Sequence, residues 1–136
     1  MIAALLLLAA CDAAGAREVA AGIVAADNAA DVERVLGYYA PEAVLQPPEE
    51  PEIKGPEIRP RYERMFATVR PKIELSIAHV NVQGEIAILQ GHNGGRLEAK
   101  DGGPGKKLDD DFVMVMRCDS GRWRISRLMW QPAPTP

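Results

Sequence analysis

The chain has 136 residues, enough for one domain with a substantial buried core. Hydrophobic residues make up 47% of it and charged residues 26%, a composition typical of a globular protein rather than a disordered one. The formal net charge of −3 argues against a nucleic-acid partner, because binding to a phosphate backbone requires a basic face. No apolar run reaches the roughly 20 residues that a helix needs to cross a bilayer.

The first residues have the pattern of an export signal. The stretch from Ile2 to Ala10 is apolar throughout and ends in the sequence LAAC, which resembles a bacterial lipobox. This resemblance implies that Cys11 is lipidated and becomes the new N-terminus, and Asp12 beside it is typical of retention at the inner membrane. No Lys or Arg precedes the apolar run, which departs from the pattern. A plain secretory peptide is the alternative.

These features predict a domain organisation and a location. We expect residues 1–16 to form a signal peptide and short tether, residues 17–131 the folded domain, and residues 132–136 a Pro-rich tail. The protein would lie on the periplasmic side of the cell envelope, anchored to the inner membrane only through the lipid on Cys11. Cys118 would then have no partner for an intramolecular disulfide, and we expect it to be structural.

Three helices are predicted in the first half of the chain. Residues 17–26 are helix-forming, and residues 27–31 break this run and offer Asp31 as an N-cap. Apolar side chains at i, i+3, i+4 and i+7 predict two further helices, at Val32, Val35, Leu36 and Tyr39, and at Tyr62, Met65, Phe66 and Val69. Ala40-Pro41 is expected to end the second helix, and residues 42–46 to form a short strand. The proline-rich residues 47–60 are expected to form a loop, with Pro60 in the first turn of the third helix.

After Pro71 the apolar residues alternate as they do in strands. The alternation slips by one residue after His79 and again between Ile125 and Leu128. Each slip predicts a β-bulge, which bends a strand and increases its twist. The expected result is a curled antiparallel sheet whose concave side the helices fill, an α+β fold. Trp123 and Trp130 would fill the widest part of that gap, because the last strands are expected in the middle of the sheet.

The order of these elements resembles the SnoaL-like group, particularly the family known as domain of unknown function 4440, within the nuclear transport factor 2-like superfamily. The similar segments are DVERVLGYYAPEAVL at residues 31–45, IKG at residues 53–55, and GRWRI at residues 121–125 continuing to MW at residues 129–130. Pro60 departs from the usual start of the third helix. The resemblance covers residues 17–131 and implies a cone-shaped α+β barrel, an apolar cavity between sheet and helices, and a homodimer. Members include isomerases, cyclases, dehydratases and proteins without demonstrated activity, so the fold does not assign a function.

Asp111, His79 and His92 are the predicted candidates for a general base in such a cavity. A two-residue turn at Gln83-Gly84 would leave the two histidines on one face, roughly 13 Å apart, so that they could not share a metal ion. Each imidazole titrates near neutral pH and could act alone. The alternative for both histidines is a strand-end residue with a solvated tip.

Asp111 is the candidate for which the sequence also suggests a partner. The acids from Asp109 to Asp111 cannot converge on one ion, because consecutive strand residues point to opposite faces. A solvated strand entrance is the alternative. With a tight turn at residues 119–121, Asp111 opposes Met129, and Arg127 is its diagonal neighbour, which would keep the carboxylate ionised. A carboxylate in an apolar cavity suits enolisation or epoxide-type chemistry.

The predicted ligand-binding residues are Tyr38, Met65, Phe66, Gln90, Arg127 and Trp130. Core packing is the alternative for Tyr38 and Trp130. We found no phosphate loop, zinc-ligand spacing or nucleotide-binding fingerprint, and we therefore expect neither a metal nor a cofactor. The favoured function is binding of a small apolar or amphipathic molecule. The alternatives are an isomerase, cyclase or dehydratase-type enzyme, and a non-catalytic dimerisation domain with a filled interior.

Overall fold

The computed structural model describes residues 11–135, so the predicted signal sequence at residues 2–10 lies outside the described residues. The helices are α1 (Ala13–Asn28), α2 (Val32–Gly37) and α3 (Ile58–Thr68), with a 3-10 turn η1 (Gly55–Glu57) before α3. The strands are β1 (Tyr39–Gln46), β2 (Ile53–Lys54), β3 (Val69–Gln83), β4 (Ile86–Ala99), β5 (Lys106–Lys107), β6 (Asp110–Asp119) and β7 (Arg122–Pro132). Within this part of the chain, no helix has the length and apolarity needed to span a membrane.

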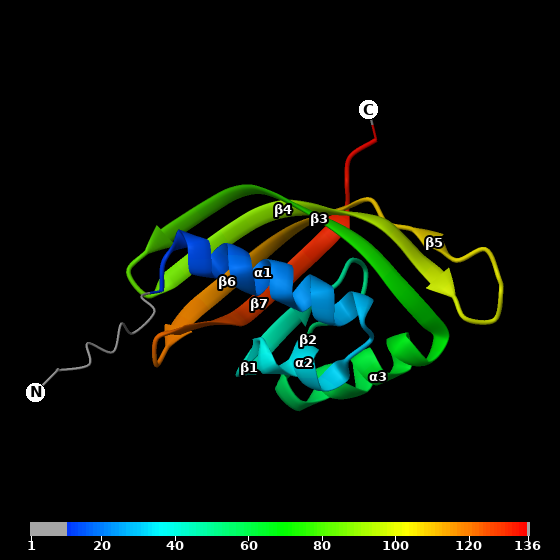
Figure 1. Cartoon of the computed structure of the whole chain (residues 1–136), viewed down its shortest axis with the longest axis horizontal. Helices are drawn as coiled ribbons and strands as arrows, with labels where there is room; N and C mark the ends of the chain where they lie inside the picture. The colour runs from blue at the N-terminus through cyan, green and yellow to red at the C-terminus, as the bar shows by residue number, and fades with distance from the viewer. Residues whose placement is uncertain (1–10, 136) are drawn as a thin grey trace, which may run out of the picture.

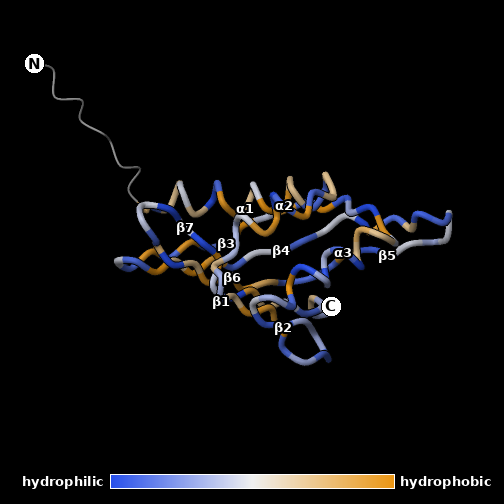
Figure 2. The backbone as a smooth tube through the Cα atoms, turned by 90° about the horizontal axis from the view of Figure 1, so that it is seen from below, coloured by the Kyte–Doolittle hydropathy of each residue, from blue (hydrophilic) through white to orange (hydrophobic). Residues whose placement is uncertain are grey.

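The strands form one curved sheet in the order β2-β1-β7-β6-β4-β3, and β5 pairs with the end of β4. Helix α1 lies across one face of this sheet, and α2 and α3 lie together at one end (Figure 1). In Figure 2, α1 and α2 form a layer over the strands. This arrangement confirms the predicted α+β cone, with β6 and β7 in the middle of the sheet. The sheet is not antiparallel throughout, because strands β1 and β7 run parallel to each other.

Both predicted β-bulges are present. Between β3 and β4 the register shifts between Ile77 and His79, which leaves Ala78 without a partner residue. Between β6 and β7 it shifts at Val115, where Ser126 is the extra residue on β7. The first bulge lies before His79 rather than after it, so His79 and Ile77 lie on opposite faces of the sheet.

The core lies between α1 and the inner face of the sheet. Small side chains let α1 approach the strands closely, since Ala16, Ala20 and Ala26 are all fully buried. Trp123 is 5% exposed, as expected for a core residue, and Ile125 is fully buried beside it. The other tryptophan, Trp130, lies in the wall of a cavity that is described below.

The folded domain begins earlier than predicted. Helix α1 starts at Ala13, and its N-cap Asp12 accepts a 2.8 Å hydrogen bond from the Gly15 N–H. Because Ala16 is fully buried, residues 12–16 are part of the domain and not a tether. The helical spacing in the sequence missed this first turn because its residues are mostly alanine and glycine, which mark no apolar stripe.

Several internal boundaries also differ from the prediction. Helix α2 ends at Gly37, Tyr39 begins β1, and Pro41 lies inside that strand instead of ending a helix. The apolar spacing that predicted the helix extends to Tyr39 by chance, although Tyr39 belongs to the strand. The predicted loop at residues 47–60 contains β2, η1 and the start of α3. Pro60 does lie in the first turn of α3, as predicted.

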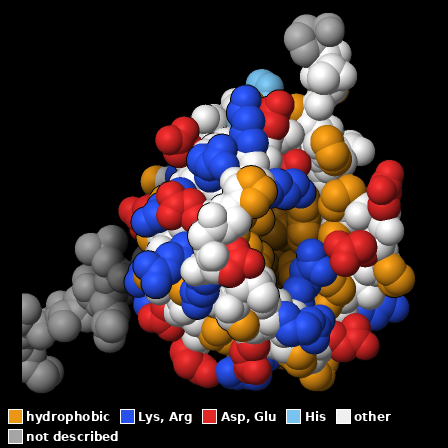
Figure 3. Space-filling view, turned by 90° about the vertical axis from the view of Figure 1, so that its right-hand side faces the viewer, with side chains coloured by type: hydrophobic (Ala, Val, Ile, Leu, Met, Phe, Trp, Pro, Cys, Tyr) orange, Lys and Arg blue, Asp and Glu red, His pale blue; other side chains and the backbone are white. Residues whose placement is uncertain are grey.

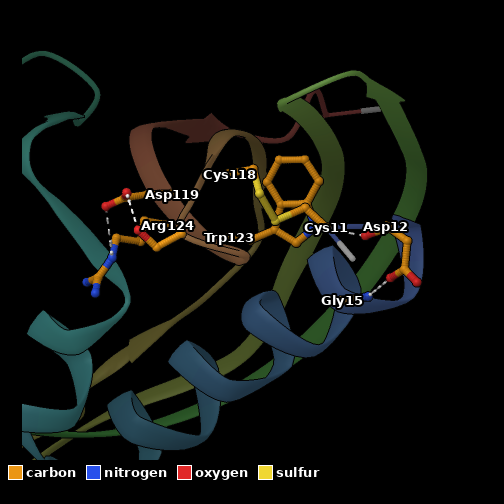
Figure 4. Close-up of a disulfide and its surroundings, with 8 residues drawn as sticks. Cys11, Asp12, Gly15, Cys118, Asp119, Trp123 and Arg124 are labelled. Carbon is orange, nitrogen blue, oxygen red and sulfur yellow. Dashed lines mark hydrogen bonds and ion pairs between the residues drawn. A yellow bond between two sulfur atoms is a disulfide. The ribbon is translucent and has the colours of Figure 1, made fainter. Parts of the chain in front are cut away.

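Cys11 and Cys118 form a disulfide across 107 residues, with 6.0 Å between their Cα atoms. It ties the start of α1 to the β6–β7 hairpin, and the Trp123 Nε1–H donates a 2.8 Å hydrogen bond to the Asp12 carbonyl beside it (Figure 4). The prediction that Cys118 has no partner is therefore wrong. One sulfur cannot hold both a lipid and a disulfide, so the predicted lipid anchor on Cys11 is incompatible with this bond.

Candidate ligand cavity

A cavity of about 650 Å³ opens at the end of the cone where α3 meets the sheet. Figure 3 looks into this end and shows a hydrophobic hollow ringed by charged side chains. Its apolar wall includes Leu45, Met65, Leu97, Phe112, Leu128 and Trp130. The volume and the mainly apolar wall are those of a site for a small molecule.

Asp27 is the only titratable carboxyl of the described residues whose pKa burial raises strongly, and it lines this cavity. Its Oδ1 atom is buried and has no hydrogen-bond partner within residues 11–135. Burial raises the pKa of Asp27 to about 7, because a carboxylate loses its hydration there without gaining a compensating donor. A carboxyl group with this pKa can accept or release a proton near neutral pH.

The neighbouring residue fixes the position of Asp27. The Asn28 side chain pairs with the backbone of Ile73, donating to its carbonyl at 3.0 Å and accepting from its N–H at 2.8 Å. These two bonds attach the end of α1 to β3. The helix end cannot turn away from the sheet while they are intact, and Asp27 is held toward the cavity.

Two buried tyrosines lie near this carboxyl group. The hydroxyl groups of Tyr39 and Tyr62 share a 2.8 Å hydrogen bond, and Tyr62 lines the cavity. Burial raises the pKa of both phenols, and the charge of Asp27 raises them further. If Tyr39 donates in this bond, the Tyr62 O–H remains free to donate to a bound molecule.

Asn93 provides a second polar group inside the cavity. It comes from the inner face of β4, and its Oδ1 atom is also buried without a partner in the described part of the chain. Sequence reasoning missed both Asp27 and Asn93. Asp27 was assigned to the helix break at residues 27–31, and Asn93 was not among the predicted site residues.

Charged residues surround the opening. The Arg61 guanidinium lies 3.2 Å from the Glu50 carboxylate and 5.7 Å from the centre of the Trp130 ring, an arrangement that holds the indole in the wall. Counting Asp27, the cavity is lined by four carboxylates and two cations: Asp27, Glu49, Glu50 and Asp110, with Arg61 and Lys106.

The structure places two of the six predicted ligand-binding residues, Met65 and Trp130, in the cavity wall. Phe66 is buried behind the wall, where its ring lies 5.6 Å from that of Tyr62. Tyr38 packs against α1 at Gly22, where any added Cβ would collide with its hydroxyl group. The side-chain spacing identified both aromatic residues as inward-facing without distinguishing the core from the cavity.

The other two, Gln90 and Arg127, lie on the outer face of the sheet, so their predicted place in the cavity is wrong. Arg127 donates to the side chains of Gln46 at 3.3 Å and Glu52 at 3.1 Å. Gln90 is exposed opposite His79. The bulge at Ser126 turns Arg127 outward.

Asp111, His79 and His92 also lie on the outer face, and their predicted place in the cone cavity is wrong. His92 pairs with Asp111 across β4 and β6, with Nδ1 3.0 Å from the Asp111 carboxylate and Nε2 3.1 Å from that of Asp109. The β3–β4 turn is Gly84-Glu85, not Gln83-Gly84, which changes the register assumed for the histidines. No cluster of three or more metal-ligating side chains was found among residues 11–135.

The register of β6 explains the misplacement of Asp111. It pairs with Gln131 rather than with Met129, and Phe112 beside it points into the core. The sequence assigned Asp111 to the face of Trp123, but Trp123 pairs with Cys118, which lies an odd number of residues from Asp111 along β6 and therefore on the opposite face. Asp111 is therefore separated from the cavity by the sheet itself.

The sequence profile of the SnoaL-like domain matches residues 20–125. Similar solved structures include a ketosteroid isomerase-like protein from Erwinia carotovora atroseptica (TM-score 0.81, 22% identity, 90% of this chain and 97% of that one). A conserved protein from Planctomyces limnophilus has a TM-score of 0.82 at 15% identity, with 88% and 96% of the chains covered. A proposed dehydratase of the nuclear transport factor 2-like family from Streptomyces avermitilis has a TM-score of 0.78 at 17% identity, with 91% and 97% covered.

The fold and its cavity thus define an α+β cone of the nuclear transport factor 2-like type. The chain belongs to the SnoaL-like domain family, as its sequence predicted. No curated protein sequence matches it. At these sequence identities the structural neighbours establish only the fold, and the function has to be inferred from the residues of the cavity.

Proposed function

We propose that the protein binds a small, largely apolar molecule in the cone cavity, with Asp27 as its principal polar contact. The observation that carries the proposal is a buried carboxyl group without a partner in a cavity of about 650 Å³. An ionised carboxylate in this position destabilises the fold, so packing gives no reason for its presence. A bound molecule that satisfies it does give one.

Binding can be tested with 4-phenyl-1-butanol, a neutral probe with an aromatic body and one polar end. We expect saturable binding by isothermal titration calorimetry. Leu128→Trp places a larger side chain in the cavity wall and should abolish binding. Glu74→Trp makes a similar change at an exposed position on the outer face of β3, and should leave the affinity unchanged. No binding, or equal effects of the two variants, would contradict the proposal.

Proton-transfer catalysis is a second candidate function, favoured by the pKa of about 7 for Asp27. In this reaction the carboxylate removes a proton from the carbon next to a ketone, and the Tyr62 O–H donates a hydrogen bond to the enolate oxygen. The carbon then takes a proton back from the carboxylic acid.

This activity can be measured as hydrogen–deuterium exchange of 4-phenyl-2-butanone in D2O by NMR. The rate should increase with pH through about 7 as Asp27 ionises, and Asp27→Asn should reduce it to the background rate. An exchange rate that is unchanged in the variant would exclude Asp27 as the base.

Export to the bacterial cell envelope is part of the proposal. The Cys11–Cys118 disulfide supports it, because disulfides persist in oxidising compartments such as the periplasm. Fractionation of cells that express the full chain should recover the oxidised protein in the periplasmic fraction. Recovery of only the reduced protein in the cytoplasm would contradict it.

We also propose a homodimer formed through the outer face of the sheet. Ile86 and Ile88 are 40% and 41% exposed there, and Val113 and Val115 on β6 lie on the same face and are partly buried. Analytical ultracentrifugation should give a dimer for the natural chain and a monomer for Ile88→Glu. A natural chain that is monomeric at high micromolar concentration would rule the dimer out.

A further inference from the structure

The polar groups inside the cavity share one chemical requirement. Asp27 and Asn93 each present a buried oxygen that accepts no hydrogen bond within residues 11–135. They come from different elements, α1 and β4, and line the same cavity. A buried acceptor without a donor carries a desolvation cost, and a charged acceptor carries a larger one. Both oxygens would be satisfied by a molecule that brings hydrogen-bond donors.

The charges around the cavity indicate the charge of that molecule. Four carboxylates and two cations line it, and one of the cations, Arg61, is already paired with Glu50. The other charged side chains of the lining are mostly carboxylates, so the electrostatic potential in the cavity is negative. This potential favours a positively charged or neutral molecule over an anion. The Trp130 and Phe112 rings and the leucines of the wall provide an apolar surface for the rest of the molecule.

We propose that the cavity selects an amphipathic amine, with its apolar body against Phe112 and Trp130 and its ammonium group donating to Asp27 and Asn93. This inference rests on the proposed binding function and names its ligand class. The ammonium group supplies up to three donors and a charge opposite to that of Asp27. Charge-assisted hydrogen bonds of this kind are about twice as strong as neutral ones. An alcohol offers a single donor and no charge, and a carboxylic acid is repelled once it ionises.

Three compounds with the same apolar body test this selection: 4-phenylbutylamine, 4-phenyl-1-butanol and 4-phenylbutyrate. In calorimetric titrations at pH 8 we expect the amine to bind at least tenfold more tightly than the alcohol, and the carboxylate to bind most weakly. Equal affinities would overturn the amine inference and leave the proposed binding function standing. The absence of binding by all three would overturn both.

The matched variants are Asp27→Asn and Glu98→Gln, the second of which changes an exposed carboxylate on β4. Asp27→Asn should reduce the advantage of the amine over the alcohol to less than threefold, and Glu98→Gln should leave it unchanged. Circular dichroism confirms that each variant is folded. An advantage that survives in folded Asp27→Asn would show that the ammonium group binds elsewhere.

A second measurement needs only the natural chain. With a pKa of about 7, Asp27 changes from about one-tenth to about nine-tenths ionised between pH 6 and pH 8. The affinity for the amine should therefore rise about tenfold across this range, and that for the alcohol should change much less. An affinity for the amine that is constant across this range would refute the inference.

Other charged groups around the cavity should not produce this pH profile. The groups that face Asp27 are Tyr39 from β1 and Tyr62 and Arg61 from α3, with Lys106, Asp110, Glu49 and Glu50 around the opening. Burial raises the pKa of both phenols, so they stay protonated over this range. The strongly raised pKa of Asp27 makes it the carboxyl group that titrates there.

Discussion

Replacing Asp27 with asparagine should stabilise the protein, and the gain should depend on pH. Burial raises the pKa of Asp27 from 3.8 to about 7, a difference of about three units. One unit corresponds to about 1.4 kcal/mol, so the ionised carboxylate lowers the free energy of unfolding by at most about 4 kcal/mol. The folded state holds the proton more tightly than the unfolded state. The contribution of Asp27 to stability is therefore highest below about pH 4, falls as the pH rises to about 7, and is constant above that.

The asparagine side chain has no ionisable group, so Asp27→Asn should remove this fall. Urea denaturation of both proteins from pH 4 to pH 8 should give equal free energies of unfolding at pH 4. At pH 8 the variant should be more stable by up to about 4 kcal/mol. Glu98→Gln should show no such divergence. Parallel curves for the natural chain and Asp27→Asn, or a less stable variant at pH 8, would refute the account of Asp27.

Three further substitutions test the surrounding structure. Cys118→Ser removes a disulfide that closes 107 residues, and should lower the free energy of unfolding by about 3 kcal/mol. Adding a reductant should not lower the stability of this variant further. A loss of less than about 1 kcal/mol would contradict the prediction. Gly91→Ala forces a Cβ against the Ser76 carbonyl and should lower the melting temperature by several degrees; an unchanged value would contradict the close approach of β3 and β4. Tyr62→Phe leaves the buried Tyr39 hydroxyl without its partner and should cost about 1–2 kcal/mol in urea denaturation, and a neutral result would argue against that hydrogen bond.

The fold could be predicted because its signals are local in the sequence. Two β-bulges appeared as slips in the apolar alternation, and each is present within a residue or two of the predicted place. A curved sheet preceded by helices then left few possible arrangements. Trp123 was correctly assigned to the core, since a large side chain in a central strand has few other places to go.

The site could not be predicted because it depends on how distant segments meet. A β-bulge misplaced by one residue moves a side chain to the other face of a sheet, and for this reason the face that carries His79 and His92 was assigned to the cavity. A turn predicted one residue too long between β6 and β7 had the same effect on Asp111. Asp27 gives no local signal. Its role depends on the length of α1 and on the attachment of Asn28 to Ile73, which lies 45 residues away.

The cysteine pairing was missed for a related reason. Cys11 lies in a short motif that predicts lipidation, and this assignment left Cys118 without a partner. The extra turn at the start of α1 carries Cys11 to the β6–β7 hairpin, where the two sulfur atoms meet. The motif predicts a lipid on the Cys11 sulfur, whereas the structure shows a disulfide to a residue 107 positions away. Only the folded chain reveals this contact.

A small molecule should bind inside the cone and not on the outer face of the sheet. Methionine methyl groups report on both places, because Met65 lines the cavity and Met129 pairs with Val113 on the outer face. With methyl-carbon-13 methionine, NMR titration with 4-phenyl-1-butanol should shift the Met65 signal and leave the Met129 signal in place. A shift at Met129 with Met65 unchanged would contradict the account.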